Sequence, residues 1–319
     1  MTDTVLDLLA CPRCRGPLTT SLEDGAPALA CAECGFLAPI VRGIPRLADQ
    51  PLTDEARRTQ ESFGYEWTQF NAPEPSGEVN FNDYFAGIEL PSLAGATVLD
   101  AGCGMGRHAR QVARHAGTVV AVDFSAAVEQ AAHNTSMHAN VQCIQADLTR
   151  LPLKDDSFDF IYSLGVLHHI ADTAGTLRGL VARLKPGGRI RIYLYWKRSG
   201  VVGWMLGLVS LVRLVTTRLP FPLLKLLCLM LSALLMAFVV LPYRLANALG
   251  IRGIGSWPLH VYTKYPFNVL YNDQFDRFSA PLEKRYSPAE VRALLASVGL
   301  TDIAVRPCYG WVADGTKPA

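Results

Sequence analysis

Three glycines at alternate positions give the first chemical signal in this sequence of 319 residues. Gly102, Gly104 and Gly106 follow a short apolar run that ends in Asp100, and a helical pattern begins directly after them. Glycines let a ligand approach bare backbone, and the first turn of a helix offers free N–H groups. A second apolar run ends in Asp123, about 20 residues beyond the first glycine, where a carboxylate can bind ribose hydroxyls. This pattern predicts a cofactor that contains a nucleoside.

The acid before the glycines decides which cofactor the loop favours. A dinucleotide site uses Gly-x-Gly-x-x-Gly and holds a pyrophosphate, which a carboxylate at Asp100 would repel. The spacing here is Gly-x-Gly-x-Gly, and the motif resembles the first motif of class I S-adenosylmethionine-dependent methyltransferases. The resemblance implies that Asp147 accepts a hydrogen bond from the adenine amino group. The residues that it assigns to the cofactor are Asp100, Gly102, Cys103, Gly104, Gly106, Asp123, Phe124, Ala146, Asp147 and Leu148.

Apolar runs alternate with helical patterns from residue 97 to residue 195, which predicts a parallel sheet with helices on both faces. As a set, these motifs resemble the type 11 methyltransferases, most closely the branch with the quinone-biosynthesis C-methyltransferases. The resemblance implies an α/β fold with a seven-stranded Rossmann-like sheet whose last, antiparallel strand lies near residues 309–313. The expected segments are a zinc ribbon at 1–49, a linker with N-terminal lid helices at 50–95, the methyltransferase core at 96–198 and 261–319, and an apolar helical hairpin inserted after the fifth strand at 199–260.

Two C-x2-C pairs near the N-terminus predict a metal site. Cys11 and Cys14 form the first pair, and Cys31 and Cys34 form the second after sixteen intervening residues. Four thiolates at this spacing are typical of a closed, structural zinc site, whereas two disulfides are disfavoured in a reducing cytosol. With the residues that follow, this segment resembles the small zinc-ribbon proteins that activate tRNA and protein methyltransferases. The resemblance implies a structural or docking role.

Methyl transfer depends more on alignment and exclusion of water than on a base. His168 and His169 follow the fourth strand, at the edge of the sheet where ligands bind. His169 is the candidate catalytic base, with a structural role as an equal alternative. The aromatic segment 62–70 looks like the lid of related enzymes, or it packs simply against the sheet. The aromatic and charged segment 271–278 lines the acceptor pocket or anchors the insertion.

Two apolar runs without charges, at 200–212 and 226–241, interrupt the core. As a helix the second run spans about 24 Å, short of a hydrocarbon core of about 30 Å, and the chain must return to finish the same sheet. We therefore expect a helical hairpin that dips into one leaflet, with flanking bases near the headgroups. A soluble apolar cap or a dimer interface is the alternative. The flanking bases are Lys197, Arg198, Arg213, Arg218, Lys225 and Arg244.

The charges of the chain are unevenly distributed around this insertion. Thirteen Lys and Arg and no acidic residue lie between Asp172 and Asp273, so the rest of the chain carries a balance of −11. Such asymmetry indicates contact with an anionic surface. The N-terminal residues lack the basic and apolar regions of a signal peptide, so we expect a cytoplasmic protein associated peripherally or monotopically with a membrane.

Together these patterns predict an S-adenosylmethionine-dependent methyltransferase with a structural zinc ion. The expected acceptor is a small, apolar or lipid-linked molecule at the membrane surface, and the sequence leaves oxygen, carbon and nitrogen open as the methylated atom. The alternative is an RNA methyltransferase, for rRNA or tRNA bases, that uses the zinc ribbon for RNA contact. An RNA enzyme needs a polar basic groove. Here the bases are interleaved with Leu, Val and Met, which disfavours a nucleic-acid partner. A binding module without activity is a weaker option.

Overall fold

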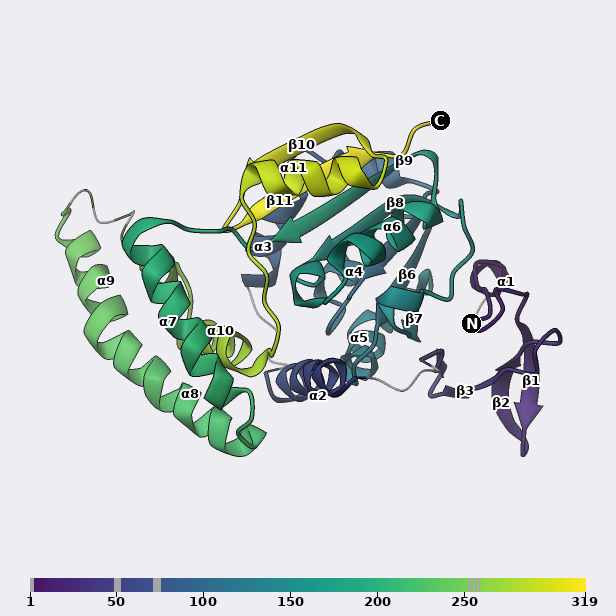
Figure 1. Ribbon diagram of the computed structural model, residues 1–319, viewed down its shortest axis with the longest axis horizontal. Helices are drawn as coiled ribbons and strands as arrows, with labels where there is room; N and C mark the ends of the chain where they lie inside the picture. The colour runs from purple at the N-terminus through teal and green to yellow at the C-terminus, as the bar shows by residue number, and fades with distance from the viewer. Residues whose placement is uncertain are drawn as a thin grey trace.

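The computed structural model describes residues 3–48, 53–70, 76–251, 253, 255, 257 and 259–319, with side chains for all of them except 76–79, 201, 202 and 205. Figure 1 shows a central sheet with one addition at each end of the long axis of the molecule. A ribbon of short strands lies at one end, and a group of long helices lies at the other.

The central sheet has seven strands in the order β10-β11-β9-β8-β5-β6-β7. Five neighbouring strands, from β9 to β7, are parallel, and β11 pairs antiparallel with β9. This arrangement confirms the predicted fold class, including the antiparallel last strand. The strands are β5 (Thr97–Ala101), β6 (Thr118–Asp123), β7 (Val141–Gln145), β8 (Phe158–Leu164), β9 (Leu184–Leu194), β10 (Thr301–Pro307) and β11 (Trp311–Thr316).

The strands of the sheet are apolar on both sides because helices cover both faces of the sheet. The side chains of Val98, Leu99 and Val120 are completely buried, as expected for parallel strands between two layers of helices. Two separate hydrophobic clusters fill the two faces of the sheet. One cluster includes α6 (Thr173–Arg183) and α11 (Pro288–Ser297), and the other includes α3 (Ser76–Phe85), α4 (Arg107–Val112) and α5 (Ala127–Thr135). Short 3-10 turns complete the core: η1 (Leu90–Leu93), η2 (Leu148–Arg150), η3 (Leu167–His169) and η6 (His260–Lys264).

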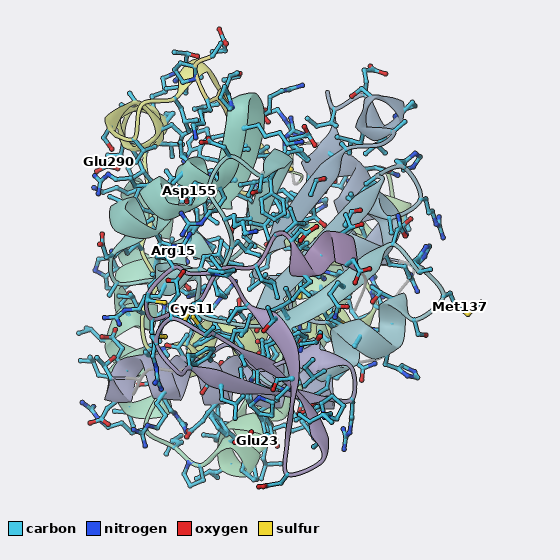
Figure 2. All side chains as sticks on the ribbon, turned by 90° about the vertical axis from the view of Figure 1, so that its right-hand side faces the viewer. Cys11, Arg15, Glu23, Met137, Asp155 and Glu290 are labelled. Atoms are coloured by element: carbon cyan, nitrogen blue, oxygen red, sulfur yellow. The ribbon has the colours of Figure 1, made fainter. Side chains whose placement is uncertain are left out.

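The N-terminal ribbon packs along the edge strand β7. The Leu47 N–H donates to the carbonyl of Gln145 in β7 at 2.8 Å, and the Ala10 N–H donates to the carbonyl of Pro152 at 3.0 Å. Arg15 donates to the carbonyl of Leu151 at 2.8 Å, and Figure 2 shows this arginine beside Cys11 on the face of the ribbon. The ribbon comprises α1 (Asp3–Leu6) and a four-stranded antiparallel sheet of β1 (Thr19–Glu23), β2 (Ala26–Ala30), β3 (Leu37–Val41) and β4 (Ile44–Pro45).

The apolar insertion follows β9 and differs in part from the expected hairpin. Its first helix is α7 (Gly200–Thr216). The second apolar run does not stop near residue 241, because one helix continues from Phe221 to Ala248 over 28 residues. Pro242 lies within it, and a five-residue π-turn before this proline accommodates the missing N–H. At about 1.5 Å per residue the helix spans roughly 42 Å, long and apolar enough to cross a membrane by length and composition. Its parts are α8 (Phe221–Leu235), η4 (Met236–Val240) and α9 (Leu241–Ala248).

Helix α10 (Phe267–Ser279) brings the chain back to the core. It packs against α7 and α8 of the insertion on one side and against α2 (Asp54–Gln69) on the other. The apolar contact with α8 is formed by Leu224, Cys228 and Phe275, all buried. The helix therefore connects the insertion with the part of the molecule that covers the glycine loop.

Candidate active site

Three positions of the glycine loop between β5 and α4 require glycine. All three have positive φ angles, +88° for Gly102, +52° for Gly104 and +76° for Gly106, a region that disfavours other residues. A Cβ atom on Gly102 would lie 2.3 Å from a methyl of Val166, and one on Gly106 would lie 3.0 Å from the Cα of Ala131. Val166 and Ala131 therefore leave no space for a side chain at Gly102 and Gly106, and the loop presents bare backbone there.

Asp123, at the end of β6, is held firmly beside this loop. One carboxylate oxygen accepts a hydrogen bond from the Gly104 N–H at 2.9 Å. The other accepts from the Ser125 N–H at 2.8 Å and from its hydroxyl at 2.7 Å. Burial raises the pKa of Asp123. A carboxylate offers about four acceptor positions, so this geometry fixes its orientation and leaves capacity for a ribose hydroxyl.

Asp100, at the end of β5, lies beside the hydroxyl of Tyr162 and keeps one oxygen atom without a partner in the described part of the chain. Its side chain is buried, and its Oδ2 atom has no hydrogen-bond partner among the described residues. Burial raises the pKa of Asp100 to about 7. A cationic group at the glycine loop would supply the missing partner and stabilise the ionised form. The residues present therefore fit the amino-acid end of S-adenosylmethionine.

The segment predicted to read adenine follows β7. The Ala146 N–H donates to the carbonyl of Asp123 at 3.0 Å, which places this segment beside the predicted ribose acid. Asp147 caps η2, and one of its oxygens accepts from the Thr149 N–H at 2.8 Å. The carbonyl of Phe124 accepts from the Gln60 amide at 2.5 Å. The ten residues assigned to the cofactor thus gather at the carboxyl ends of β5, β6 and β7, and their cofactor contacts remain predictions.

The two adjacent histidines lie in different environments. The Nδ1 of His169 is 2.6 Å from the carbonyl of Leu282, so this nitrogen carries the proton and Nε2 is left for another partner. His168 is completely buried and has no hydrogen bond to either ring nitrogen among the described residues. Its ring centroid lies 3.9 Å from that of Tyr195, with the two rings tilted by 33°. Burial lowers the pKa of His168 well below the usual value. The carbonyl contact supports the structural role for His169, and its role as base remains a prediction.

Helix α2 covers the glycine loop. The indole Nε1 of Trp67 lies 3.3 Å from the position that a Cβ on Gly104 would take, and the Arg107 guanidinium is 5.4 Å from the Trp67 ring. The segment therefore lies where the lid was predicted. Tyr65 and Phe70 contact α8 and α10 instead of the sheet, so the alternative of packing against the sheet is wrong for these two rings. Cavities of about 440 and 430 Å³ lie elsewhere, at the edge of β7 and beside β10.

A second group of polar side chains lies under α2, and the sequence did not indicate that they converge. We call Glu66, Asn272, Asp273 and Asp276 the acidic chamber. Glu66 is almost completely buried in α2, and electrostatic contact with Asp273 and Asp276 of α10 contributes to the rise of its pKa after burial itself. The spacing of residues 272, 273 and 276 on one face of a helix was the available signal.

The four cysteines of the ribbon form a metal site of the predicted kind. All four Sγ atoms lie within 4.8 Å of one another. The Cys11 and Cys34 sulfurs are 3.5 Å apart, and those of Cys14 and Cys31 are 3.4 Å apart. A tetrahedral zinc ion with Zn–S bonds of about 2.3 Å would separate the sulfurs by about 3.8 Å, so the set fits zinc closely. Four protein ligands leave no open position for catalysis, and the zinc is structural.

Comparison with known families assigns both parts of the chain. Residues 99–192 match the family described as "Methyltransferase domain", and residues 2–43 match the family described as "Trm112p-like protein". The core is an S-adenosylmethionine-dependent methyltransferase domain. The N-terminal segment is a Trm112-like zinc ribbon, and the two together confirm the resemblance on which the sequence-based predictions rest.

Individual relatives cover the methyltransferase domain. Phosphoethanolamine N-methyltransferase 1 of Triticum aestivum is 37% identical over 109 residues, which cover 32% of this chain and 22% of that protein. The ubiquinone biosynthesis O-methyltransferase of Alkalilimnicola ehrlichii is 31% identical over 156 residues, which cover 44% of this chain and 62% of that protein. The chain thus spans less than two thirds of either relative. One relative is named for nitrogen and the other for oxygen, so neither methylated atom is favoured.

A solved structure shares the fold over most of the chain. A complex of the Haloferax volcanii Trm112 methyltransferase activator with a methyltransferase is similar with a TM-score of 0.50 and 16% sequence identity. The match covers 82% of this chain and 99% of that one. At this identity the similarity concerns the fold alone.

Proposed function

We propose that this chain transfers the methyl group of S-adenosylmethionine to a small acceptor that is apolar or lipid-linked, and that it does so at a membrane surface. The observation that carries the transfer reaction is the buried carboxylate of Asp100 beside the glycine loop, whose Oδ2 atom has no partner among the described residues. The observation that carries the membrane surface is the bare apolar face of the helical insertion.

The chain contributes binding, orientation and exclusion of water to this reaction. When the cofactor is bound, Asp100 would pair with its amino group, Asp123 would hold the ribose, and the segment 146–148 would contact adenine. S-adenosylmethionine supplies an electrophilic methyl group when it is bound. Trp67 lies over Gly104, so α2 excludes water from the loop and aligns the two reactants. Because Trp67 packs tightly on the loop, we expect α2 to shift when the cofactor enters.

The outer face of the insertion is unusually apolar. In the described part of the chain, eighteen of the twenty-three exposed large apolar side chains lie between Trp204 and Trp257. Such a concentration is typical of a protein or membrane contact rather than of a free surface. Phe238 and Trp204 are the most exposed of them, at 75% and 73%. The segment contains no acidic residue, so the face offers no negative charge to a basic partner.

Three of the six bases near the insertion complete contacts within the protein. Arg213 is buried and forms an ion pair with Glu283 at 3.1 Å. Lys225 donates to the side chain of Gln69 at 2.8 Å, and Arg244 donates to the carbonyl of Tyr265 at 2.7 Å. The prediction of a position near the headgroups is wrong for Arg213, which is buried and paired inside the protein. For the other five bases it stays a prediction. Membrane binding would therefore depend mainly on apolar insertion.

The position of the long helix favours a helix that lies in one leaflet over one that spans the bilayer. Its inner side chains, including Leu224 and Cys228, are buried against α10, which belongs to the core. A helix that crossed a bilayer would have to separate these contacts. A helix with one face on the protein and the other apolar suits the membrane interface.

Two measurements test the proposal separately. Labelled S-adenosylmethionine is incubated with the full-length protein and with lipid, RNA and protein fractions, and we expect label in the lipid fraction. Flotation with phosphatidylcholine vesicles, with and without anionic lipid, tests the membrane surface. We expect binding to both compositions and little release by salt, because screening weakens charge interactions but not apolar insertion. Label in RNA alone would establish the alternative function, and protein that ignores both vesicles would exclude the membrane surface.

A further inference from the structure

The acidic chamber, formed by Glu66, Asn272, Asp273 and Asp276, lies at the same edge of the sheet as the cofactor residues. Trp67, which follows Glu66 in α2, covers Gly104, and the charge of Arg107 at the start of α4 acts on Glu66. On the other side, the hydroxyl of Tyr195, just beyond the end of β9, donates to Asp276 Oδ2 at 3.1 Å. Ligands bind at this edge in sheets of this kind.

The chamber contains buried acceptor atoms without donors. Among the described residues, Glu66 Oε2, Asn272 Oδ1 and Asp276 Oδ1 have no hydrogen-bond partner. Glu66 is only 1% exposed, and it belongs to a different helix from the other three residues. Proteins rarely leave such atoms unpaired, and those that remain need an explanation such as a missing ligand. The raised pKa of Glu66 leaves a proton on its carboxyl that can serve one neighbouring acceptor, so the acceptor that remains needs a donor from a ligand.

The charges of the chamber point to the same class of ligand. Burial raises the pKa of Glu66 well above its usual value and leaves this carboxyl neutral. The carboxylates of Asp273 and Asp276 then balance two guanidinium groups, those of Arg107 and Arg277, both of which interact with Asp273. Asp273 also accepts from the hydroxyl of Tyr262 at 2.8 Å. An anionic ligand would add a further negative charge to this buried group and would be repelled. A hydroxyl or an amine would not.

Helix α10 places an apolar surface directly behind the chamber. Residues 272, 273 and 276 lie on one side of the helix, whereas Phe275 and Phe278 on another side contact the apolar insertion. Tyr65 of α2 stacks on Phe221 of α8 at 5.0 Å and extends this aromatic surface toward α8. A ligand with a polar head in the chamber would therefore have an apolar surface for its body.

We propose that the acidic chamber binds the head of the methyl acceptor, and that this head is a hydroxyl or an amine carried on an apolar body. This inference rests on the proposed function, and it excludes acceptors with a carboxylate or phosphate head. Glu66 and Asp276 accept hydrogen bonds from the head and hold it under α2, beside the glycine loop. The chamber thus selects acceptors whose head carries a hydrogen-bond donor.

The test uses three probes with one apolar body and three heads: phenylbutylamine, phenylbutanol and phenylbutyrate. Calorimetry on the full-length protein first measures S-adenosylhomocysteine binding and then probe binding to that complex. We expect the amine and the alcohol to bind at least about tenfold more tightly than the carboxylate, which corresponds to about 1.4 kcal/mol. Absence of cofactor-product binding would refute the proposed function, whereas product binding without selection among the heads would refute this inference alone.

Variants separate binding from folding. Glu66→Gln and Asp276→Asn keep the shape of each side chain, and each should abolish the preference for the amine over the carboxylate. Glu61→Gln, at an exposed position of the same helix, is the matched control and should leave the preference unchanged. If Glu66→Gln lowers the melting temperature but retains the preference, the chamber only joins α2 to α10 and the inference is wrong. If Glu66→Gln fails to fold, Asp276→Asn decides by the same criterion.

Discussion

The ribbon and the insertion are both additions to the methyltransferase sheet, but their apolar side chains meet different surroundings. Val5, Leu9, Leu29 and Leu47 of the ribbon are buried in the same cluster as the side chains of β5 and β6. The insertion buries a narrow stripe against α10 and leaves its outer face exposed. The ribbon is therefore part of the core of this chain, whereas the insertion is a surface that remains to be covered.

The polar contacts of the two additions differ in the same way. The ribbon contacts the core on both sides of the predicted adenine segment, at Gln145 before it and at Leu151 and Pro152 after it. The insertion is held through α2, where Arg58 donates to the carbonyls of Thr217 at 2.9 Å and Leu219 at 2.6 Å. The ribbon thus supports the cofactor end of the site, and the insertion is linked to the helix that covers it.

The largest effect is expected from the loss of zinc. Cys11→Ser removes a buried zinc ligand. Structural zinc sites contribute directly to folding, so we expect the ribbon to unfold. The zinc content should fall from one per chain to none. Affinity for S-adenosylmethionine should fall with it, since the segment 146–150 loses its support. Metal analysis, thermal unfolding and calorimetry measure these changes. Cys308→Ser, outside the ribbon, is the control, and unchanged cofactor affinity in the Cys11 variant would separate the ribbon from the site.

A smaller effect is expected at the contact between ribbon and core. Arg15→Ala removes the hydrogen bonds to the carbonyls of Leu151 and Leu153, and the free energy of unfolding should fall by about 1–2 kcal/mol. This is at the lower end of the range for charged donors because the Arg15 side chain is 42% exposed. Arg42→Ala removes a ribbon ion pair at the surface and should change the same quantity by less than about 1 kcal/mol. Equal effects in denaturant unfolding would mean that Arg15 is not an anchor.

The site between the two additions should respond to pH. Asp100 has a pKa of about 7 without a ligand, because burial disfavours its ionised form. A cationic ligand needs that ionised form, so affinity for S-adenosylmethionine should be lost as the pH falls below 7, approaching tenfold per pH unit. Calorimetry from pH 8 to pH 5.5 measures the change. The Asp100→Asn variant should bind weakly with a flat profile, and a flat profile in the unmodified protein would remove Asp100 from the site.

Substitutions at the outer face of the insertion should have the smallest effect on stability. Their effect on vesicle binding should nevertheless be clear. Replacing Leu208, Leu211 and Phe238 by Ser should change the free energy of unfolding by no more than about 0.5 kcal/mol per site, since these side chains are exposed. Flotation with vesicles should decrease strongly. Leu22→Ser, at an exposed position of the ribbon, should leave flotation unchanged. A large loss of stability would instead mean that this face is covered, as in the dimer interface that the sequence left open.

The features that could be predicted from the sequence alone depend on the spacing of residues that lie close together along the chain. The glycines of the loop, the acids at the strand ends and the paired cysteines lie within short stretches, so their chemistry follows from the order of residues alone. The alternation of apolar runs and helical patterns likewise predicted the sheet, because parallel strands between helices are buried on both faces.

Only the tertiary structure decided features that depend on distant residues. Glu66 of α2 interacts electrostatically with Asp273 and Asp276 of α10, and no local pattern indicates that these residues come near one another. Arg213 resembled a headgroup anchor in the sequence, but its charge is paired inside the protein with Glu283, seventy residues further along the chain. The direction of a charged side chain depends on which partner the fold brings near. The spacing of residues fixes local geometry, whereas the pairing of buried charges is decided by packing between elements.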